Sequence, residues 1–407
     1  MIKKTVNLVM SVANDSGNGY SKTYCQFEDS SSSVSITPSL YAPISTSERM
    51  PNLDDLKFQE SNNNMDVVIK SSALKVVGEY LVGQAAITSG NYLMDYNVEA
   101  NTGKAAPDIS IIIPVTKIAY AALTHEFNKT HNIPTTINVS LAHYLTCLPI
   151  SEFSNSKKRE QLHKRLCKGK HVVTIKSLDY DVKVNIDFNN ENTFIYPEGI
   201  AAQIGLIYNP EDPRFFRQGE LYKNAPYKDG LAYRNSGNVL LIDIGDGTTD
   251  FSIMNKTHPL RGLGVNTSLN QGVGTAAAAA SEQLTIDFPQ LHYTRSVFLE
   301  HAAKDDKEGS ILKNKYLEPQ LNLLLAAIEK EIEKEFRKTN NDISTVVVLG
   351  GGINLLTEEN KTSLQGMLDA LNPFEVHQKI WWISPKYSQL LNLDGLRIYL
   401  SHKLAQN

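Results

Sequence analysis

Residues 239–250 read V-L-L-I-D-I-G-D-G-T-T-D, and they constrain the fold more than any other stretch of the chain. The apolar run at 239–242 predicts a strand that is buried on both faces. The run ends on Asp243, and Asp246 with Gly247 predicts a tight hairpin turn with positive φ angles. A carboxylate at a strand end beside a glycine turn is typical of a phosphate-binding concavity, although an ordinary β-hairpin has the same pattern.

A second copy of this pattern lies near the start of the chain. Residues 5–13 predict a strand that leads into Asp15 and a turn containing Gly17 and Gly19, in which Asn18-Gly19 is a strong hairpin signal. The aspartate and the two glycines have the same spacing as in residues 243–247. One copy alone is best interpreted as a hairpin. Two copies with equal spacing, one in each half of the chain, favour a pair of phosphate-binding turns.

Composition excludes several classes of protein. The chain has 407 residues, of which 41% are hydrophobic and 21% charged, as expected of a globular protein with two or more domains. Its net charge of −4 gives no electrostatic reason to bind nucleic acid or an anionic membrane directly. Cys25, Cys147 and Cys167 are far apart, so we expect free thiols and no metal site made from them. There is neither a signal-peptide pattern nor an apolar run near the ~20 residues of a membrane span, so we expect a cytoplasmic protein.

Between and after the two turns, the sequence predicts further strands and helices. An amphipathic helix is expected at residues 319–337, with charges that are mostly solvated, although one of them could contact a bound nucleoside. Residues 259–265 predict a third strand for the second hairpin. Residues 43–66 are polar and are interpreted as a surface insertion, and residues 209–236, which are polar with scattered aromatic residues, are interpreted as a connector. This connector marks the junction between the two halves.

Glu198 follows a predicted strand at 193–197 and precedes a predicted helix at 200–207. Proline suits the first position of a helix and glutamate suits its first turn, so helix capping alone explains Pro197 and Glu198. The other interpretation places Glu198 in a cleft between the halves, where its carboxylate polarises a water molecule. The local sequence slightly favours capping.

Two further glycine-rich segments lie in the second half. Gly272 and Gly274 precede an alanine-rich helix, which suits either a ligand at the helix N-terminus or close packing of the helix on a sheet. Residues 345–349 predict a buried strand that ends on Gly350, Gly351 and Gly352, and a helix is expected from Ile353 onward. Three consecutive glycines allow a nucleoside or phosphate to lie against bare backbone. Neither a dinucleotide fingerprint nor a phosphate loop of the G-x-x-x-x-G-K-[ST] type is present.

Taken in order, these segments resemble the nucleotide-binding signature of the actin, Hsp70 and sugar-kinase superfamily. Residues 15–22 resemble its first phosphate motif, with Lys22 in the place of actin's lysine. Residues 243–250 resemble the second phosphate motif, and residues 349–354 resemble the adenosine motif. Each motif alone is weak, whereas the ordered set is specific and spans nearly the whole chain.

Within the superfamily the chain is similar to ParM-type bacterial actins, which segregate plasmids. Residues 146–153 read T-C-L-P-I-S-E-F and resemble a strand-to-loop segment of those proteins. Residues 197–198 resemble their Pro-Glu pair, and residues 81–83 resemble their L-V-G turn. The segments 43–66 and 209–236 have no obvious counterpart.

The resemblance implies an α/β fold with two RNase-H-like, actin-like ATPase domains around a nucleotide cleft. Domain I would comprise residues 1–198, including the insertion 43–66, with residues 386–407 returning to it. Domain II would comprise residues 199–385. The implied cofactors are Mg²⁺ and either ATP or GTP, between which the sequence does not distinguish.

The resemblance also implies roles for single residues. Asp15 and Asp243 would hold Mg²⁺, mostly through waters, and Glu198 would orient or polarise the water that attacks the γ-phosphate. These three are the implied catalytic residues. The implied nucleotide-binding residues are Ser16, Gly17, Asn18, Gly19, Tyr20, Lys22, Gly245, Asp246, Gly247, Thr248, Gly274, Gly350, Gly351, Gly352 and Ile353.

The implied function is a filament-forming NTPase that polymerises to segregate plasmid DNA. Its partners would be further copies of itself and a DNA-binding adaptor protein on the plasmid centromere, with no direct contact to nucleic acid or membrane. Other possibilities are an actin-like cytoskeletal protein of a bacterium or phage with another cargo, or a small-molecule kinase of the same superfamily. A sugar-reading loop for such a kinase is not evident in the sequence. A chaperone ATPase would need a substrate-binding domain after the ATPase, and we expect none.

Overall fold

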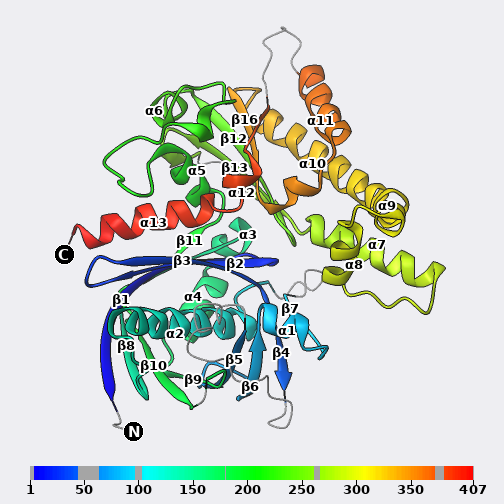
Figure 1. Ribbon diagram of the computed structural model, residues 1–407. Helices are drawn as coiled ribbons and strands as arrows, with labels where there is room; N and C mark the ends of the chain where they lie inside the picture. The colour runs from blue at the N-terminus through cyan, green and yellow to red at the C-terminus, as the bar shows by residue number, and fades with distance from the viewer. Residues whose placement is uncertain are drawn as a thin grey trace. The chain divides into compact units, whose positions relative to one another are not determined.

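The computed structural model describes residues 4–44, 64–96, 103–178, 180–260, 266–371 and 380–406. The chain divides into two compact units, each built on one mixed β-sheet with helices (Figure 1). Unit 1 comprises Met1–Ala201 and Asn392–Asn407, and unit 2 comprises Ala202–Leu391. The predicted α/β fold class is confirmed. Most of the insertion predicted at 43–66 lies outside the described residues.

In unit 1 the described strands form a sheet in the order β3-β2-β1-β8-β10-β9-β5-β6-β4-β7, and β11 also pairs with β8. The strands are β1 (Thr5–Ser16), β2 (Tyr20–Phe27), β3 (Ser32–Pro38), β4 (Leu40–Ile44), β5 (Met65–Lys70), β6 (Gly78–Val82), β7 (Met94–Asp95), β8 (Thr136–Leu148), β9 (His171–Ile175), β10 (Val182–Phe188) and β11 (Thr193–Pro197). The helices are α1 (Gln84–Thr88), α2 (Ile109–Thr130), α3 (Ile150–Ser154), α4 (Ser156–Leu166), α5 (Ile200–Ile207), at whose start the unit ends, and α13 (Leu391–Leu404).

The two faces of this sheet have different partners. On one face α2 runs across the strands, and its Ile111, Ile118 and Leu123 are buried in the same apolar core as the strand residues (Figure 1). Side chains alternate along β2, so Cys25 points into that core while Tyr24 lies on the other face. There the Arg397 guanidinium of α13 lies 4.4 Å from the centre of the Tyr24 ring. Unit 1 is therefore a layered α/β structure with the sheet in the middle.

The register of three parallel strands determines which residues meet at one edge of this sheet. Asn14 of β1 pairs with Thr146 of β8, and Pro197 of β11 pairs with Leu148 of β8. The residues at or just beyond the strand ends are therefore neighbours. Asp15, Cys147 and Glu198 come together in this way.

In unit 2 the described strands form a sheet in the order β14-β13-β12-β16-β17, and β15 also pairs with β13. The strands are β12 (Asn238–Ile244), β13 (Thr249–Asn255), β14 (His258–Pro259), β15 (Thr267–Leu269), β16 (Thr345–Leu349) and β17 (Ile380–Trp382). The helices are α6 (Gly230–Arg234), α7 (Val273–Asp287), α8 (Arg295–Ala302), α9 (Lys307–Ile311), α10 (Glu318–Lys338), α11 (Glu358–Leu371) and α12 (Pro385–Ser388). Short 3₁₀ segments lie at Glu220–Tyr222 and Gly351–Leu355, and a π-helical segment lies at Leu312–Leu317.

Both faces of the central strands of unit 2 are buried, as the unbroken apolar run predicts. Leu240 and Ile242 of β12 pack in a core with α7 and α10, while Leu241 packs in a second core with Leu206 of α5 and Trp381 of β17. All seven residues of β12 are buried. Because β12 is covered on both faces, the residues near its end, which include Asp243, are fixed in position by packing.

Two polar segments of this unit contain residues that are buried. Most of residues 209–236 are exposed or partly exposed, but Tyr222 and Tyr233 are buried against Trp381, with ring centroids 5.0 and 5.5 Å away. Most charges of α10 are at least partly exposed, as expected, but Glu331 and Glu335 are buried, and each accepts a hydrogen bond from a lysine three residues later. Aromatic residues and ion-paired carboxylates can be buried within a segment that is polar overall, and the composition of the segment does not show which of its residues are buried.

The strand predicted at 259–265 is only partly described. Pro259 ends the short strand β14, and residues 261–265 lie outside the described part of the chain. The edge of β13 near the turn pairs instead with β15. Within the described residues, no helix combines the length and the apolar character that crossing a membrane requires.

Candidate functional site

The first predicted turn lies between β1 and β2, and Asp15 and Lys22 face each other across these strands. The Lys22 ammonium lies 3.1 Å from Asp15 Oδ2, and both side chains are largely buried. The hairpin that Asn18-Gly19 predicts is present, although neither residue has a positive φ angle. Gly17 is required for a different reason, because a Cβ there would lie 2.6 Å from the Tyr20 carbonyl oxygen and 3.0 Å from Lys22 Nζ.

Other predicted residues of this turn have partners within unit 1. The Ser16 hydroxyl accepts a hydrogen bond from Asn14 Nδ2 at 2.6 Å. The Gly17 carbonyl accepts one from the hydroxyl of Ser39 at 2.6 Å, so the turn is held by the chain that follows β3. The Tyr20 side chain is half exposed. The turn is thus fixed by its neighbours and places Lys22 beside Asp15.

The second predicted turn connects β12 to β13, and Gly245 N donates to Thr248 O across it at 2.9 Å. Asp246 and Gly247 have no positive φ angle, so the φ angles predicted for this turn are wrong. A Cβ on Gly245 would lie 2.9 Å from Thr248 O, which again makes close approach the reason for glycine. Asp246 forms an ion pair of 2.9 Å with Arg295, a residue that the sequence did not single out.

The start of α7 packs directly on this second turn. Val273 N donates to Gly245 O at 3.1 Å, and Gly274 N donates to Asp246 O at 2.7 Å. A Cβ on Gly272 would lie 2.5 Å from Gly245 O. Close packing of helix on turn therefore accounts for the small residues at this N-terminus, and the Gly274 N–H already has an acceptor.

The glycine run after β16 lies beside Asp243. β12 and β16 are parallel, and Asp243 pairs with Leu349, so Gly350 directly follows the residue next to that carboxylate. Gly350 has φ +99° and ψ 165°, which essentially only glycine adopts. Gly352 is equally confined, since a Cβ there would lie 2.7 Å from Ile244 O, and Ile353 is buried in the apolar core of unit 2. The helix expected from Ile353 begins only at Glu358, after the 3₁₀ segment.

A cavity of about 490 Å³ in unit 2 borders the chain that follows these glycines. Asn354 and Thr357 line one side, and Lys304, Asp305 and Lys313 from the segment around α9 line the other. Its lining residues lie before α10, at 299–317, and after it, at 354–357, so α10, one charge of which we expected near a bound nucleoside, does not line this cavity. The cavity was not predicted, because its two walls are about 40 residues apart in sequence and neither carries a local motif.

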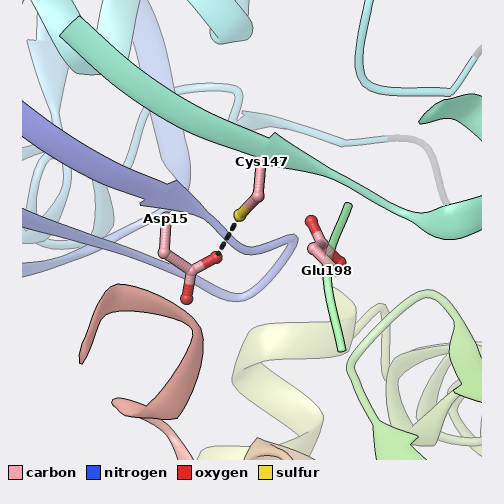
Figure 2. A group of neighbouring side chains, drawn as sticks. All are labelled: Asp15, Cys147 and Glu198. Carbon is pink, nitrogen blue, oxygen red and sulfur yellow. Dashed lines mark hydrogen bonds between the residues drawn. The ribbon is translucent and has the colours of Figure 1, made fainter. Parts of the chain in front are cut away.

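In unit 1, Asp15, Cys147 and Glu198 form a buried cluster at the ends of β1, β8 and β11 (Figure 2). Their ligand atoms lie within 4.8 Å of one another, and the Cys147 thiol lies 3.5 Å from Asp15 Oδ1. Burial raises the pKa of Cys147 well above its ordinary value, and the carboxylates of Asp15 and Glu198 raise it further. Cys147 is therefore a neutral thiol that donates to Asp15.

Lys104, which the sequence did not single out, completes this cluster. Its Nζ lies 2.7 Å from Glu198 Oε1, and the side chains of Lys104 and Glu198 are only 6% and 8% exposed. Burial lowers the pKa of Lys104, but the ion pair with Glu198 outweighs it, so the pKa rises above its ordinary value. No local sequence pattern indicates that Lys104 is buried or that it forms an ion pair. Only the fold shows that it meets a residue 94 positions away.

The chemistry of these donors fits Mg²⁺ only in part. Mg²⁺ takes oxygen ligands and keeps several waters, so the Asp15 carboxylate suits it. Cys147 is a neutral thiol, and the Glu198 carboxylate is already paired with the Lys104 ammonium, so neither group suits a directly coordinated metal. Within this cluster, the Asp15 carboxylate is therefore the group whose chemistry suits Mg²⁺.

These features define the class of fold, which is actin-like. Comparison with solved structures shows this fold along the full chain at low sequence identity. The actin-like protein Alp7A covers 98% of this chain, and 98% of its own chain is covered, with 15% identity and a TM-score of 0.66. No family model and no curated protein matches the sequence.

Two ParM structures are similar over the same extent. The ParM of a 15-stranded filament from Clostridium botulinum has 16% identity and a TM-score of 0.60, and 98% of this chain and 99% of that chain are covered. ParM from Bacillus thuringiensis with AMPPNP has 16% identity and a TM-score of 0.57, with the same coverage. At these identities the likeness shows the fold alone.

Proposed function

We propose that this protein is an NTPase that binds ATP or GTP with Mg²⁺, polymerises in the nucleotide-bound state and segregates plasmid DNA. The observation that carries the proposal is the arrangement in unit 2, where Asp243, the last residue but one of the buried strand β12, lies beside the Gly350 backbone. Unit 1 presents the equivalent carboxylate, Asp15, beside Lys22. Two such strand ends with equal spacing supply the acceptors and backbone that a Mg²⁺-nucleotide requires.

Residues of each unit have a proposed role. In unit 1, Lys22 would contribute positive charge to the phosphates and the Asp15 carboxylate would hold Mg²⁺ through water, and in unit 2 the Asp243 carboxylate would also hold Mg²⁺ through water. When bound, Mg²⁺ neutralises phosphate charge and polarises the phosphoryl oxygens. Glu198 orients the attacking water and accepts its proton, since its carboxylate is buried in the same cluster as Asp15. The cavity beside Asn354 has room for the nucleoside.

Assembly follows from the fold and from what the similar proteins do. The Clostridium botulinum ParM forms a filament, and the Bacillus thuringiensis ParM was observed with AMPPNP. A head-to-tail contact between identical subunits that does not close on itself generates a filament. We propose that this chain assembles in that manner and that an adaptor protein on the plasmid connects the filament to DNA.

Nucleotide titration tests the proposed site. Fluorescent ATP and GTP are titrated with and without Mg²⁺ into the wild type and into Asp243→Ala. We expect Mg²⁺ to raise the affinity of the wild type for at least one nucleotide, and the variant to lose that increase. Asp369→Ala, which removes an exposed carboxylate from α11 of the same unit, serves as the matched control. Equal Mg²⁺ dependence in wild type and Asp243→Ala would remove Asp243 from the site.

A further inference from the structure

We propose that Lys104 is a positioning residue for Glu198, which it holds by one carboxylate oxygen so that the other oxygen keeps a fixed direction. The inference rests on the proposed function, in which Glu198 handles the attacking water. It adds a residue and a supporting segment that the strand-and-turn motifs do not include. Four contacts, all within unit 1, carry it.

The first contact is the ion pair itself. Lys104 Nζ lies 2.7 Å from Glu198 Oε1 and both side chains are nearly inaccessible to solvent. Breaking a buried pair by removing one partner leaves an uncompensated charge, whereas an intact pair is held in one geometry. A carboxylate that must orient a water molecule needs such a fixed geometry, because small displacements reduce the rate strongly.

The second and third contacts fix the main chain of Lys104. Its N–H donates to both carboxylate oxygens of Glu152, at 2.8 and 2.9 Å, and the Ala105 N–H donates to Glu152 Oε2 at 3.3 Å. Gly103 has φ +66°, and a Cβ there would meet the Glu152 carboxylate. The Ser110 hydroxyl donates to the Lys104 carbonyl oxygen. A buried carboxylate thus clamps the turn that presents the lysine.

The fourth contact fixes the main chain of Glu198 to the same support. Its N–H donates to Leu148 O at 2.8 Å, at the end of β8. Glu152 lies in α3, which begins two residues after Leu148. The segment from Leu148 to Glu152 therefore anchors both members of the ion pair, Glu198 through a carbonyl oxygen and Lys104 through a carboxylate. This gives a structural reason for the glutamate in the L-P-I-S-E stretch of the sequence.

The charges of the cluster support a positioning role over a metal site. Asp15 and Glu198 are acidic, Cys147 is a neutral thiol, and Lys22 and Lys104 each contact one of the two carboxylates. The ammonium of Lys104 therefore occupies the side of Glu198 where a directly bound cation would otherwise lie. Lys22 contacts Asp15 and Lys104 contacts Glu198, so the two lysines have separate roles.

The test is a double-mutant cycle in phosphate release at saturating nucleotide. Lys104→Met is expected to lower the rate about tenfold or more, since a positioned base contributes about 10²–10⁴-fold, while nucleotide affinity stays within about threefold. In the Glu198→Gln background, Lys104→Met is expected to change the rate by less than about twofold, because the group through which it acts is already gone. A purely structural role would lower both rates by the same factor.

Two further variants complete the design. Glu152→Gln weakens the clamp without touching the ion pair, and it gives the same comparison should Lys104→Met fail to fold. Lys4→Met is the matched control, because it removes an ion pair of 2.9 Å with the buried Glu126 in the same unit, at the far end of β1 from Asp15. We expect the control to hydrolyse nucleotide at the wild-type rate.

The outcomes separate the two proposals. If Glu198→Gln lowers the rate but Lys104→Met does not, or lowers it equally in both backgrounds, the inference about Lys104 is wrong and the proposed function stands. If Glu198→Gln itself hydrolyses nucleotide at the wild-type rate, the catalytic assignment of Glu198 is wrong. The inference about Lys104 is then wrong as well, because it depends on that assignment. Loss of Mg²⁺-nucleotide binding in both variants that carry Lys104→Met, but not in Glu198→Gln alone, with native folding retained, would show a binding role for Lys104 and overturn the positioning role.

Discussion

Replacing Gly350 by alanine should damage both the fold of unit 2 and the candidate site. Gly350 has φ +99° and ψ 165°, a region that residues with a side chain avoid. A Cβ added there would meet the Ile244 carbonyl oxygen and Asp243 Oδ1. Neither atom moves easily, because both belong to the buried end of β12. The substitution therefore strains the backbone and displaces the carboxylate that we assign to Mg²⁺.

The magnitude follows from two separate terms. A side chain in this backbone region costs about 1–3 kcal/mol, and forcing an extra methyl group into a packed site costs about 1–3 kcal/mol more. The sum is about 2–6 kcal/mol. Because each kcal/mol moves the Tm of a unit of this size by about 2–4 °C, the melting temperature should fall by at least about 4 °C.

Gly351→Ala provides the matched control, since the same methyl group is added one residue away. Gly351 is exposed, and its nearest neighbour would be Gln389 Cγ at 3.7 Å, an ordinary contact. A surface change of this kind alters stability by only about 0.5 kcal/mol. Both variants are compared with wild type by thermal denaturation and by Mg²⁺-nucleotide titration. Equal melting temperatures for the two variants would refute the steric argument, and an unchanged nucleotide affinity in Gly350→Ala would separate Asp243 from the site.

Two further predictions concern single groups of unit 1. Glu198→Gln should still assemble with nucleotide but release phosphate at least about a hundredfold more slowly, because a positioned base is lost; a wild-type rate in a phosphate-release assay would contradict this. Burial, together with a smaller contribution from the charge of Lys22, lowers the pKa of Lys117 to about 7, whereas in the unfolded chain it is about 10.4. Between about pH 7 and pH 10 the unfolded state therefore binds the additional proton, so the free energy of unfolding should rise with pH over this window. Lys117→Met should lack that rise in urea denaturation, and identical pH dependence in both proteins would show that Lys117 keeps its ordinary pKa.

Local sequence patterns predicted the strands and their ends well. The buried run before Asp243, the matching hairpin at Asp15 and the strand before Gly350 are all present, because apolar runs and glycine turns are local signals. The reason for the turn glycines was predicted wrongly. Gly17 and Gly245 are needed because carbonyl oxygens approach them closely, and such an approach depends on hydrogen bonds across the turn that spacing alone does not show.

Features that depend on long-range packing were not predictable from one sequence. Lys104 meets Glu198 only because a turn is clamped by Glu152, and no local pattern connects these three positions. Likewise Tyr222 and Tyr233 lie in a polar segment but are buried by Trp381, more than a hundred residues further along the chain. In both cases the partners are far apart in sequence and carry no periodic pattern.

Nucleotide-dependent sedimentation tests the central claim most directly. The protein is incubated with Mg²⁺ and ATP, GTP, ADP or no nucleotide, and is then centrifuged at a speed that pellets filaments but not subunits. We expect the wild type to pellet with ATP or GTP and to stay in the supernatant without nucleotide, with Asp243→Ala remaining in the supernatant throughout. A wild-type protein that binds neither triphosphate and pellets equally under all four conditions, or under none, would contradict the account.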